Sequence, residues 1–292
     1  MTTSLYTITA MSNLHPGSGD ANYGIIDKLV QRDPITGLPV VHASSLKGAI
    51  LQHFFYQTGM SNEYIDEVFG GQTSKNKRIN EEAPNVNGKR GEFVFLEAQL
   101  LSLPVRCNSD VTPFFRVTSP GILTELRQQM INTGLLAKED VLAKALQTIV
   151  QKVKTKPLAL QSVNQKDLRL EDQKFGEIEV IDPKTSGLDK VAKLLGDYAI
   201  VVPDKTLEQL SDNHHLPVIA RNHLENGQST NLWYEQVLPR QTRLWFAVMN
   251  PEILKEATDF KDRLCTKGMV QIGANASVGY GYCTVESFKV KP

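Results

Sequence analysis

Two segments of this chain read as strands that must be buried. Residues 93–105, FVFLEAQLLSLPV, carry apolar side chains on both faces of a strand, and residues 242–249, TRLWFAVM, do the same. A strand without a polar face is not stable at a surface that is open to water. The chain must therefore build a sheet that other elements cover.

A strand and a helix precede the first of these segments. Residues 4–12 alternate as a strand does, and residues 42–59 place Leu46, Ile50 and Phe54 at intervals of four. This spacing gives a helix one apolar face. The N-terminal part therefore has the order strand, helix, strand.

The same order returns near the C-terminus. Residues 242–249 are followed by Asn250-Pro251, which is typical of a helix start, and residues 268–290 read as strand, glycine-rich loop and strand. Strand–helix–strand at both ends predicts an α+β fold with a ferredoxin-like sheet and large insertions. No linker rich in Pro, Gly and Ser divides the chain, so we expect one domain over residues 1–292.

Composition excludes several classes of protein. The 32 Lys and Arg residues balance 32 Asp and Glu residues, so binding to RNA would need local basic patches. There is no apolar run long enough for a membrane span, and the N-terminus does not read as a signal peptide. The three cysteines are few and far apart, which argues against disulfides and a Cys-based zinc site and indicates a cytoplasmic protein.

Two insertions interrupt the predicted sheet. Residues 70–92 are almost devoid of apolar side chains, so we expect a flexible surface insertion. Residues 152–182 contain two strand-like pieces that predict a hairpin. Lys152, Lys154 and Lys156 would share one face of a strand there. Such a face could follow a phosphate backbone, or it could simply protect a sheet edge.

Two backbone features are candidates for phosphate binding. Ser44 or Ser45 can cap the helix of residues 42–59, and Lys47 adds a charge where the first N–H groups of the helix are unpaired. The loop GANASVGYG holds Gly273, Gly279 and Gly281, which would let a backbone approach a ligand closely. Plain helix capping and a flexible turn are the alternatives.

Asp27 and His15 are the candidates for chemistry. Asp27 stands between apolar neighbours near glycine-rich loops, where it could bind a metal, accept a proton or be an ordinary loop carboxylate. His15 could act as an acid or base, or it could be structural. The adjacent His214 and His215 point apart more often than they share a metal.

The arrangement of these motifs resembles a known family. NLHPGSGDANYGIIDKLVQRDPITGLPVVHASSLKGAI resembles the N-terminal signature of the RAMP superfamily of CRISPR effector proteins, and GANASVGYGYCTV resembles its glycine-rich loop, with Ala274 in place of a second glycine. LLSLPVR, FFRVTSP and ARNHLENGQSTNLWYEQVLPRQT resemble the type III-B (Cmr) backbone subunit, which is repeated in an RNA-targeting complex.

This resemblance implies an antiviral endoribonuclease that is active in an assembled complex. Asp27 would cleave the target RNA with a divalent metal, Mg²⁺ or Mn²⁺, or as a proton acceptor. A thumb hairpin, placed at residues 152–182, would intrude between guide and target. The implied partners are a crRNA guide, single-stranded target RNA, other copies in a helical stack and other Cmr subunits, without a membrane. The expected RNA-binding residues are His15, Ser44, Ser45, Lys47, Lys152, Lys154, Gly273, Gly279 and Gly281.

Three other interpretations stay open. A guide-processing endonuclease of the same superfamily would use His15 as general base and need no metal. A purely structural RNA-binding scaffold would leave Asp27 as a loop carboxylate. An unrelated ferredoxin-like metabolic enzyme would share the fold alone.

Overall fold

The computed structural model describes residues 1–19, 24–57, 60–71, 90–153, 156–161, 167–251, 256–266 and 268–288. The strands are β1 (Thr2–Ala10), β2 (Val40–Val41), β3 (Val94–Phe95), β4 (Ala98–Arg106), β5 (Phe114–Thr118), β6 (Leu158–Ala159), β7 (Leu168–Leu170), β8 (Gln173–Phe175), β9 (Glu179–Val180), β10 (Ala199–Val201), β11 (Val218–Glu225), β12 (Gln228–Gln236), β13 (Arg243–Asn250), β14 (Val270–Gln271) and β15 (Tyr282–Ser287). The helices are α1 (Ala43–Gln57), α2 (Asn62–Phe69), α3 (Pro120–Asn132), α4 (Val141–Lys152), α5 (Pro183–Ser186), α6 (Asp189–Leu195), α7 (Asp204–Leu210) and α8 (Glu256–Thr266).

The central strands have the ferredoxin-like order. β15 pairs with β1, β1 pairs with β13, and β13 pairs with β4, all antiparallel. α1 follows β1 in the chain, and α8 lies between β13 and β15. The sheet then continues through β5, β10, β6 and β9. The predicted α+β fold with a ferredoxin-like core is confirmed.

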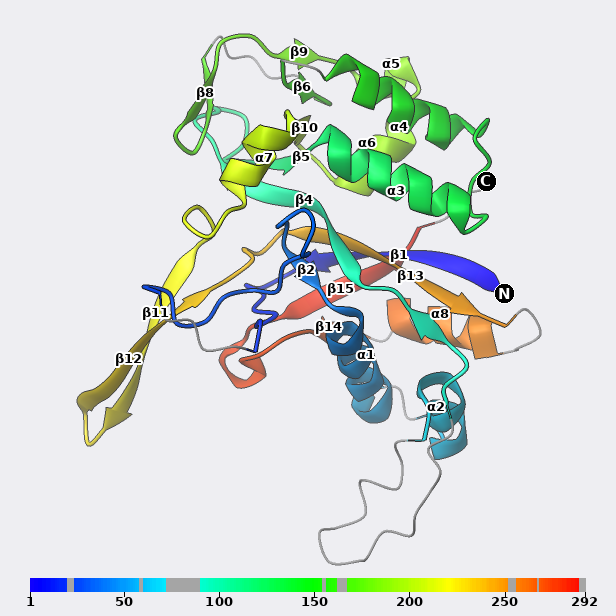
Figure 1. Ribbon diagram of the computed structural model, residues 1–292, viewed down its shortest axis with the longest axis vertical. Helices are drawn as coiled ribbons and strands as arrows, with labels where there is room; N and C mark the ends of the chain where they lie inside the picture. Colours follow the sequence, from blue (N-terminus) through cyan, green and yellow to red (C-terminus); the bar gives the residue numbers. More distant parts are fainter. Residues whose placement is uncertain are drawn as a thin grey trace, which may run out of the picture.

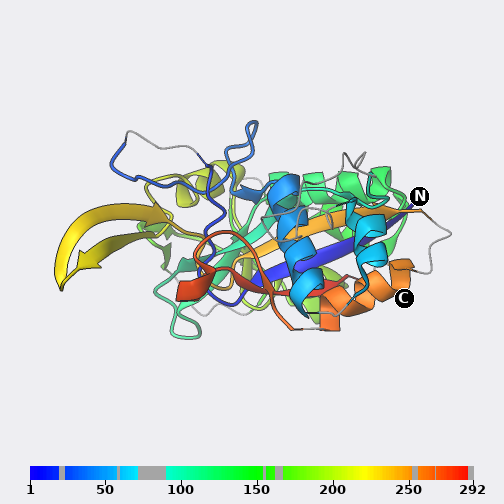
Figure 2. The ribbon, with the colours of Figure 1, turned by 90° about the horizontal axis from the view of Figure 1, so that it is seen from below.

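Helices cover both faces of the central strands, as the doubly apolar segments require. On β1 and β13, Tyr6 and Phe246 belong to one core with the side chains of α1 and α8. Their neighbours Leu5 and Trp245 belong to a second core with α3, α4 and α6. Figure 1 shows these two groups of helices on opposite sides of β1 and β13, and Figure 2 shows α1, α2 and α8 together. Burial on both faces explains why these strands lack a polar side.

Phe260 of α8 is the centre of an aromatic cluster. Its ring centroid lies 5.0 Å from that of Phe54, 5.2 Å from Phe93 and 5.9 Å from Phe95. The ring is 1% exposed. The Phe260 side chain therefore connects α8 to α1 and to the segment leading into β3.

Two local predictions are wrong. α1 begins at Ala43, so Ser44 and Ser45 lie inside its first turn and neither is the cap. Lys152 is the last residue of α4, so it does not share a strand face with Lys156. Lys154 lies outside the described residues. α1 begins earlier in the chain, and α4 ends later, than the local sequence pattern predicts.

The insertions also differ from expectation. Residues 152–182 do not form one long hairpin, because β6 and β9 join the main sheet and only β7 and β8 make a short hairpin between them. The long hairpin is formed instead by β11 and β12, and it projects from the body in both views (Figures 1 and 2). Most of the predicted insertion, residues 72–89, lies outside the described residues.

None of the helices in the described part of the chain is long and apolar enough to cross a membrane. All three cysteines are unpaired, as predicted.

Replacing Phe260 by Ala should destabilise the fold by about 3–5 kcal/mol, because it removes the shared ring and leaves a cavity. Chemical denaturation followed by circular dichroism measures this change. Tyr56→Ala on α1 is the matched control, since the Tyr56 side chain is 70% exposed. A loss of stability in Phe260→Ala that is no greater than in the control would contradict the proposed role of the cluster.

Candidate functional site

A hollow of about 710 Å³ gathers residues from four distant parts of the chain. His15, Asp27, Ser45 and Gly273 line it, together with Pro16, Gly17, Ser18, Gly19, Lys28, Leu29, Gln31 and Ala274. Four of the residues singled out in the sequence therefore lie around one space. Ser44, Lys47, Lys152, Gly279 and Gly281 do not line it.

Asp27 is held at the edge of this hollow by the base of the long hairpin. The backbone N–H of Asp27 donates to the carbonyl oxygen of Tyr234 at 3.1 Å, and its carboxylate Oδ2 accepts from the Tyr234 N–H at 2.7 Å. Within the described part of the chain, Oδ1 has no hydrogen-bond partner. An exposed carboxylate with a fixed direction and one oxygen available can bind a cation or accept a proton.

Glu235, the residue after Tyr234, has a buried carboxylate that accepts hydrogen bonds from four side chains. Glu235 is fully buried and accepts from Lys28 Nζ at 3.0 Å, Arg221 Nη1 at 3.0 Å, Trp233 Nε1 at 2.7 Å and Asn275 Nδ2 at 2.8 Å. Burial alone would raise the pKa of Glu235, but the hydrogen bonds from Trp233, Lys28 and Arg221 and the charge of Lys28 outweigh it and lower the pKa to about 2.

Glu235 thereby joins three separate segments. Lys28 belongs to the Asp27 loop, Arg221 lies on β11, and Asn275 lies in the glycine-rich loop. Lys28 Nζ also lies 5.2 Å from the centroid of the Trp233 ring. Local sequence reasoning missed this group, because Lys28 and Glu235 are 207 positions apart. Glu235 fixes the loop that carries Asp27.

His15 occupies a structural position. It is 3% exposed, and its Nδ1 lies 2.6 Å from the carbonyl oxygen of Gln236. A carbonyl can only accept, so Nδ1 carries a proton and donates it. A Cβ added to Gly17 would lie 3.0 Å from His15 Nε2, so a side chain at position 17 would press on the imidazole ring.

Gln31 links the hollow to the start of α1. Its Nε2 donates to Ser45 Oγ at 3.0 Å and to the Gly17 carbonyl at 3.1 Å, while its Oε1 accepts from the His42 N–H at 2.7 Å. The Ser45 hydroxyl is therefore part of the frame of the site. Gln31 is a second residue that the sequence analysis missed.

Lys47 points away from the hollow. Its Nζ lies 6.0 Å from the centroid of the Phe95 ring, and burial together with the charge of Arg90 lowers the pKa of its ammonium group. A role in holding RNA stays a prediction for Lys47, at a position separate from Asp27.

The glycine-rich loop packs against residues 13–16. The N–H of Ala274 donates to the His15 carbonyl at 3.0 Å, and that of Gly281 donates to the Asn13 carbonyl at 2.8 Å. A side chain at Gly273 or Gly281 would collide with backbone atoms, and both residues have positive φ angles. Gly279 also has a positive φ but faces open space. Close packing therefore requires glycine at positions 273 and 281 whether or not RNA binds.

The two described lysines of the predicted basic face are paired with carboxylates. Lys152 Nζ lies 3.0 Å from Glu179 Oε1, and Lys156 forms an ion pair with Glu177. These contacts tie the end of α4 and the approach to β6 to the segment around β9. A continuous basic stripe is absent from the described part of this region.

The described residues contain no cluster of three or more His, Cys, Asp or Glu side chains that could hold a metal ion. Glu235 is fully engaged by its four donors, which leaves Asp27 as the carboxylate of the hollow among the described residues. A single carboxylate does not form a resident metal site, since Mg²⁺ requires six ligands. The residues of the hollow could bind a metal ion only if most of the ion's ligands came from outside this chain.

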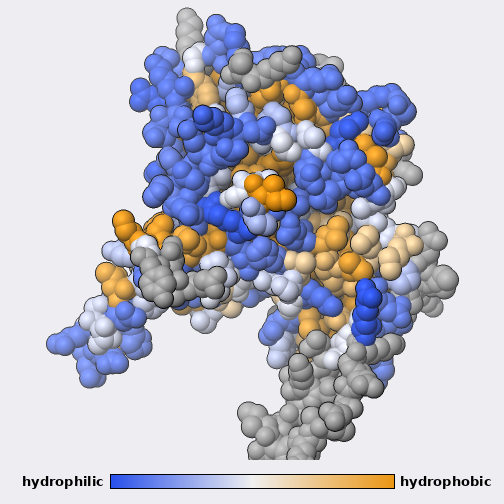
Figure 3. Space-filling view, in the orientation of Figure 1, coloured by the Kyte–Doolittle hydropathy of each residue, from blue (hydrophilic) through white to orange (hydrophobic). Residues whose placement is uncertain are grey.

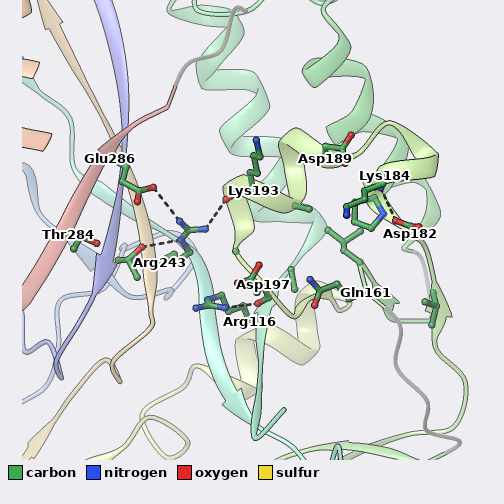
Figure 4. Close-up of a pocket in the computed structure, with 17 residues that line it drawn as sticks. Arg116, Gln161, Asp182, Lys184, Asp189, Lys193, Asp197, Arg243, Thr284 and Glu286 are labelled. Carbon is green, nitrogen blue, oxygen red and sulfur yellow. Dashed lines mark hydrogen bonds and ion pairs between the residues drawn. The ribbon is translucent and has the colours of Figure 1, made fainter. Parts of the chain in front are cut away.

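A second hollow of about 750 Å³ contains charged groups but none of the predicted site residues (Figure 4). Arg243 Nη1 donates to the carbonyls of Lys193 and Leu194 at 2.9 and 3.0 Å, and Arg116 Nη1 donates to that of Asp197 at 2.6 Å. Cations at a helix C-terminus stabilise the helix. These two arginines therefore fasten α6 to the sheet.

Replacing Glu235 by Gln should weaken the fold in a pH-dependent way. The folded pKa of about 2 lies below the ordinary value of 4.5, so the carboxylate stabilises the fold above pH 4.5 and this contribution is lost as the pH falls toward 2. Glu235→Gln should therefore cost on the order of 3 kcal/mol at pH 7 and about half as much at pH 3. Denaturant unfolding at the two pH values measures the difference.

Glu63→Gln, at an exposed position in the first turn of α2, is the control. If Glu235→Gln and the control unfold alike at pH 7, the buried carboxylate does not hold the site together.

Known proteins are similar to this chain over nearly its whole length. The Cmr endoribonuclease Cmr4 of the CRISPR system of Pyrococcus furiosus is 26% identical over 304 residues, which cover 96% of this chain and 93% of the relative. A cryo-EM structure of the type III-B Cmr-beta bound to cognate target RNA has a TM-score of 0.78 at 22% identity and covers 100% of this chain and 99% of the other.

A crystal structure of oligomeric Cmr4 from Pyrococcus furiosus has a TM-score of 0.68 at 18% identity and covers both chains completely. The family model of the RAMP superfamily matches residues 7–284. Since this match includes both halves of the ferredoxin-like core, the Asp27 loop and the glycine-rich loop, the chain belongs to the RAMP superfamily.

Proposed function

We propose that this chain is the repeated backbone subunit of a type III-B CRISPR ribonucleoprotein complex that holds a crRNA guide and cleaves complementary target RNA. The similarity to a Cmr endoribonuclease and to a Cmr-beta bound to cognate target RNA supports this function. The observation that carries it is the position of Asp27, an exposed carboxylate fixed by Tyr234 where the long hairpin leaves the body.

The long hairpin is the better candidate for the thumb that separates guide from target. β11 and β12 form a two-stranded sheet of their own that meets residues 27 and 28 at its base, and Leu224 and Leu232 near its outer part are 57% and 56% exposed. Apolar side chains such as Leu can wedge between bases. Because Tyr234 and Glu235 end this hairpin, a nucleotide displaced by it would lie close to Asp27. We therefore transfer the thumb assignment from residues 152–182 to residues 218–236.

The chemistry needs a base, a fixed geometry and a cation that neutralises charge at the phosphate. The 2′-hydroxyl of the target RNA attacks the neighbouring phosphorus, a new O–P bond forms, and the bond to the 5′-oxygen breaks. Asp27 Oδ1 takes the 2′-hydroxyl proton, and water protonates the leaving oxygen. The hydrogen bond from Tyr234 uses Oδ2 and so leaves Oδ1 available among the described residues.

Mg²⁺ or Mn²⁺ would assist this reaction as an ion held mainly by RNA. Asp27 would supply one ligand, and phosphate oxygens and waters would complete the shell. Such an ion would neutralise charge at the scissile phosphate. The chain's own contribution is the direction of the Asp27 carboxylate.

Assembly explains how a neutral subunit can hold RNA. Several copies in a helical stack would bind one guide, so that modest contacts multiply. Helix starts and glycine-rich loops contact the RNA backbone without reading bases, which suits a subunit that must accept any guide. The free thiols are consistent with a complex in the reducing cytoplasm.

The guide-processing alternative is less well supported. It requires His15 as a general base, but this side chain is 3% exposed and its Nδ1 is bound to Gln236. The scaffold alternative differs from our proposal only in the role of Asp27, so mutation of that residue separates the two.

Asp27→Asn should reduce target cleavage by the assembled complex at least about 100-fold, because the amide cannot accept a proton or hold a cation in the same way. The amide oxygen can still accept from the Tyr234 N–H, so the loop and the binding of guide and target should be unchanged. Single-turnover cleavage of labelled target RNA and a filter-binding assay measure the two effects.

Asp110→Asn, at another exposed loop carboxylate, is the matched control and should cleave normally. Normal cleavage by Asp27→Asn would support the scaffold alternative. Lost RNA binding would make Asp27 a structural residue.

Removing divalent metal with EDTA should stop cleavage while the complex keeps its target RNA, and Mg²⁺ or Mn²⁺ should restore the rate. The same single-turnover assay in EDTA and after adding back each ion measures this. Cleavage that persists in EDTA would contradict the metal requirement and leave Asp27 as a proton acceptor alone.

A further inference from the structure

A third hollow, which shares no lining residue with the Asp27 site, has an apolar floor and an acidic rim. It has a volume of about 620 Å³ and lies between the turn of residues 33–37, α3 and α7. Its apolar lining comes from Leu38, Val40, Leu100, Ile122, Leu207 and Trp245. Ile35 also lines it and is 92% exposed.

The charged groups around this hollow all have one sign. Asp33, Glu125, Asp204 and Glu208 line it, and no Lys, Arg or His does so among the described residues. None of the four forms an ion pair with another described residue. The chain carries no net charge, so this is a local concentration of negative charge.

Local hydrogen bonds keep two of these carboxylates in place without neutralising them. Asp33 accepts from the N–H groups of Ile35 and Thr36, and Asp204 accepts from that of Gly121 at 2.7 Å. Arg32, in the same turn, instead donates to Asn213 and Gly37. The hollow therefore keeps its net negative charge in the folded protein.

These features exclude two classes of ligand. An RNA backbone would be repelled by four carboxylates. A hydrated cation would not account for an apolar floor or for the exposed Ile35. The face of the molecule drawn in Figure 3 carries separate apolar groups among hydrophilic residues.

We propose that this hollow is the docking site for a segment of a different polypeptide, in which a large apolar side chain is flanked by Lys or Arg. The apolar side chain would fill the floor beside Ile35, and the flanking cations would face the four carboxylates. Complementary charge around an apolar centre is the usual arrangement of a specific protein interface.

The described surface of a second copy of this chain lacks a matching segment. Fourteen large apolar side chains are exposed in the described structure, among them Leu224, Leu232 and Tyr56, and none of them is next to Lys or Arg in the sequence. The described residues therefore favour another protein as the source of the complementary chemistry, and the crosslinked peptide distinguishes it from residues 289–291, Lys-Val-Lys, of a second copy. This inference does not depend on the proposed cleavage activity.

Site-specific photo-crosslinking tests the proposal in the native complex. Ile35→p-benzoyl-L-phenylalanine places the reactive ketone beside the hollow, and its 92% exposure means that the fold tolerates the change. The tagged chain is produced in its native cell, irradiated and purified, and the crosslinked peptide is sequenced by mass spectrometry. Val141→p-benzoyl-L-phenylalanine, at a position 71% exposed on α4, is the control position.

Charge reversal tests the electrostatic part. Glu125→Lys combined with Glu208→Lys should lower the crosslink yield at position 35 by at least about tenfold, because like charges would face each other. Glu63→Lys combined with Glu139→Lys changes the net charge equally at exposed positions elsewhere and should leave the yield unchanged. Raising the salt concentration should also lower the yield.

The expected result is a crosslinked peptide from another protein with Lys or Arg beside an apolar residue, lost on charge reversal at the hollow alone. A peptide from this chain, a peptide without flanking cations, an RNA adduct or no adduct at position 35 would each overturn the proposal. A yield that the reversal at the hollow does not change would do the same.

Discussion

The candidate site depends on the burial of one charge. Removing a carboxylate from water costs several kcal/mol unless donors replace the lost hydration. Glu235 is fully buried, and its donors come from the Asp27 loop, the hairpin and the glycine-rich loop. The charge is stable only when all three segments have closed around it. Because Asp27 binds the neighbouring Tyr234, its position follows from that closure.

The same closure attaches the hairpin to the body. β11 and β12 form a sheet of their own, so no ladder of the main sheet fixes their direction. The attachment relies on contacts at the base, where the N–H of Gln236 donates to the Lys28 carbonyl at 2.9 Å and Gln236 accepts from His15. A hairpin held only at its base can project far and still present Asp27 at a defined place. His15, a catalytic candidate in the sequence, contributes to this attachment as a structural residue.

Sequence patterns predicted what local physics determines. The doubly apolar strands β4 and β13, the helix α1 and the ferredoxin-like order follow from periodicity, because burial of apolar side chains decides them. Patterns failed where a tertiary contact competes with a local one. Lys152 continues α4 and meets Glu179, although alternation with Lys156 suggested a strand. The partners of Glu235 could not be found, because no local rule relates residues 207 positions apart.

Charge segregation reconciles a neutral chain with two kinds of partner. The hollow between the turn of residues 33–37, α3 and α7 concentrates four carboxylates without a cation in its described lining, so the rest of the chain carries an excess of four positive charges. A surface that repels RNA at one place raises the fraction of RNA that binds elsewhere. The acidic hollow and the Asp27 site share no lining residue. A protein partner can therefore occupy the first while RNA occupies the second, and the two can be mutated independently.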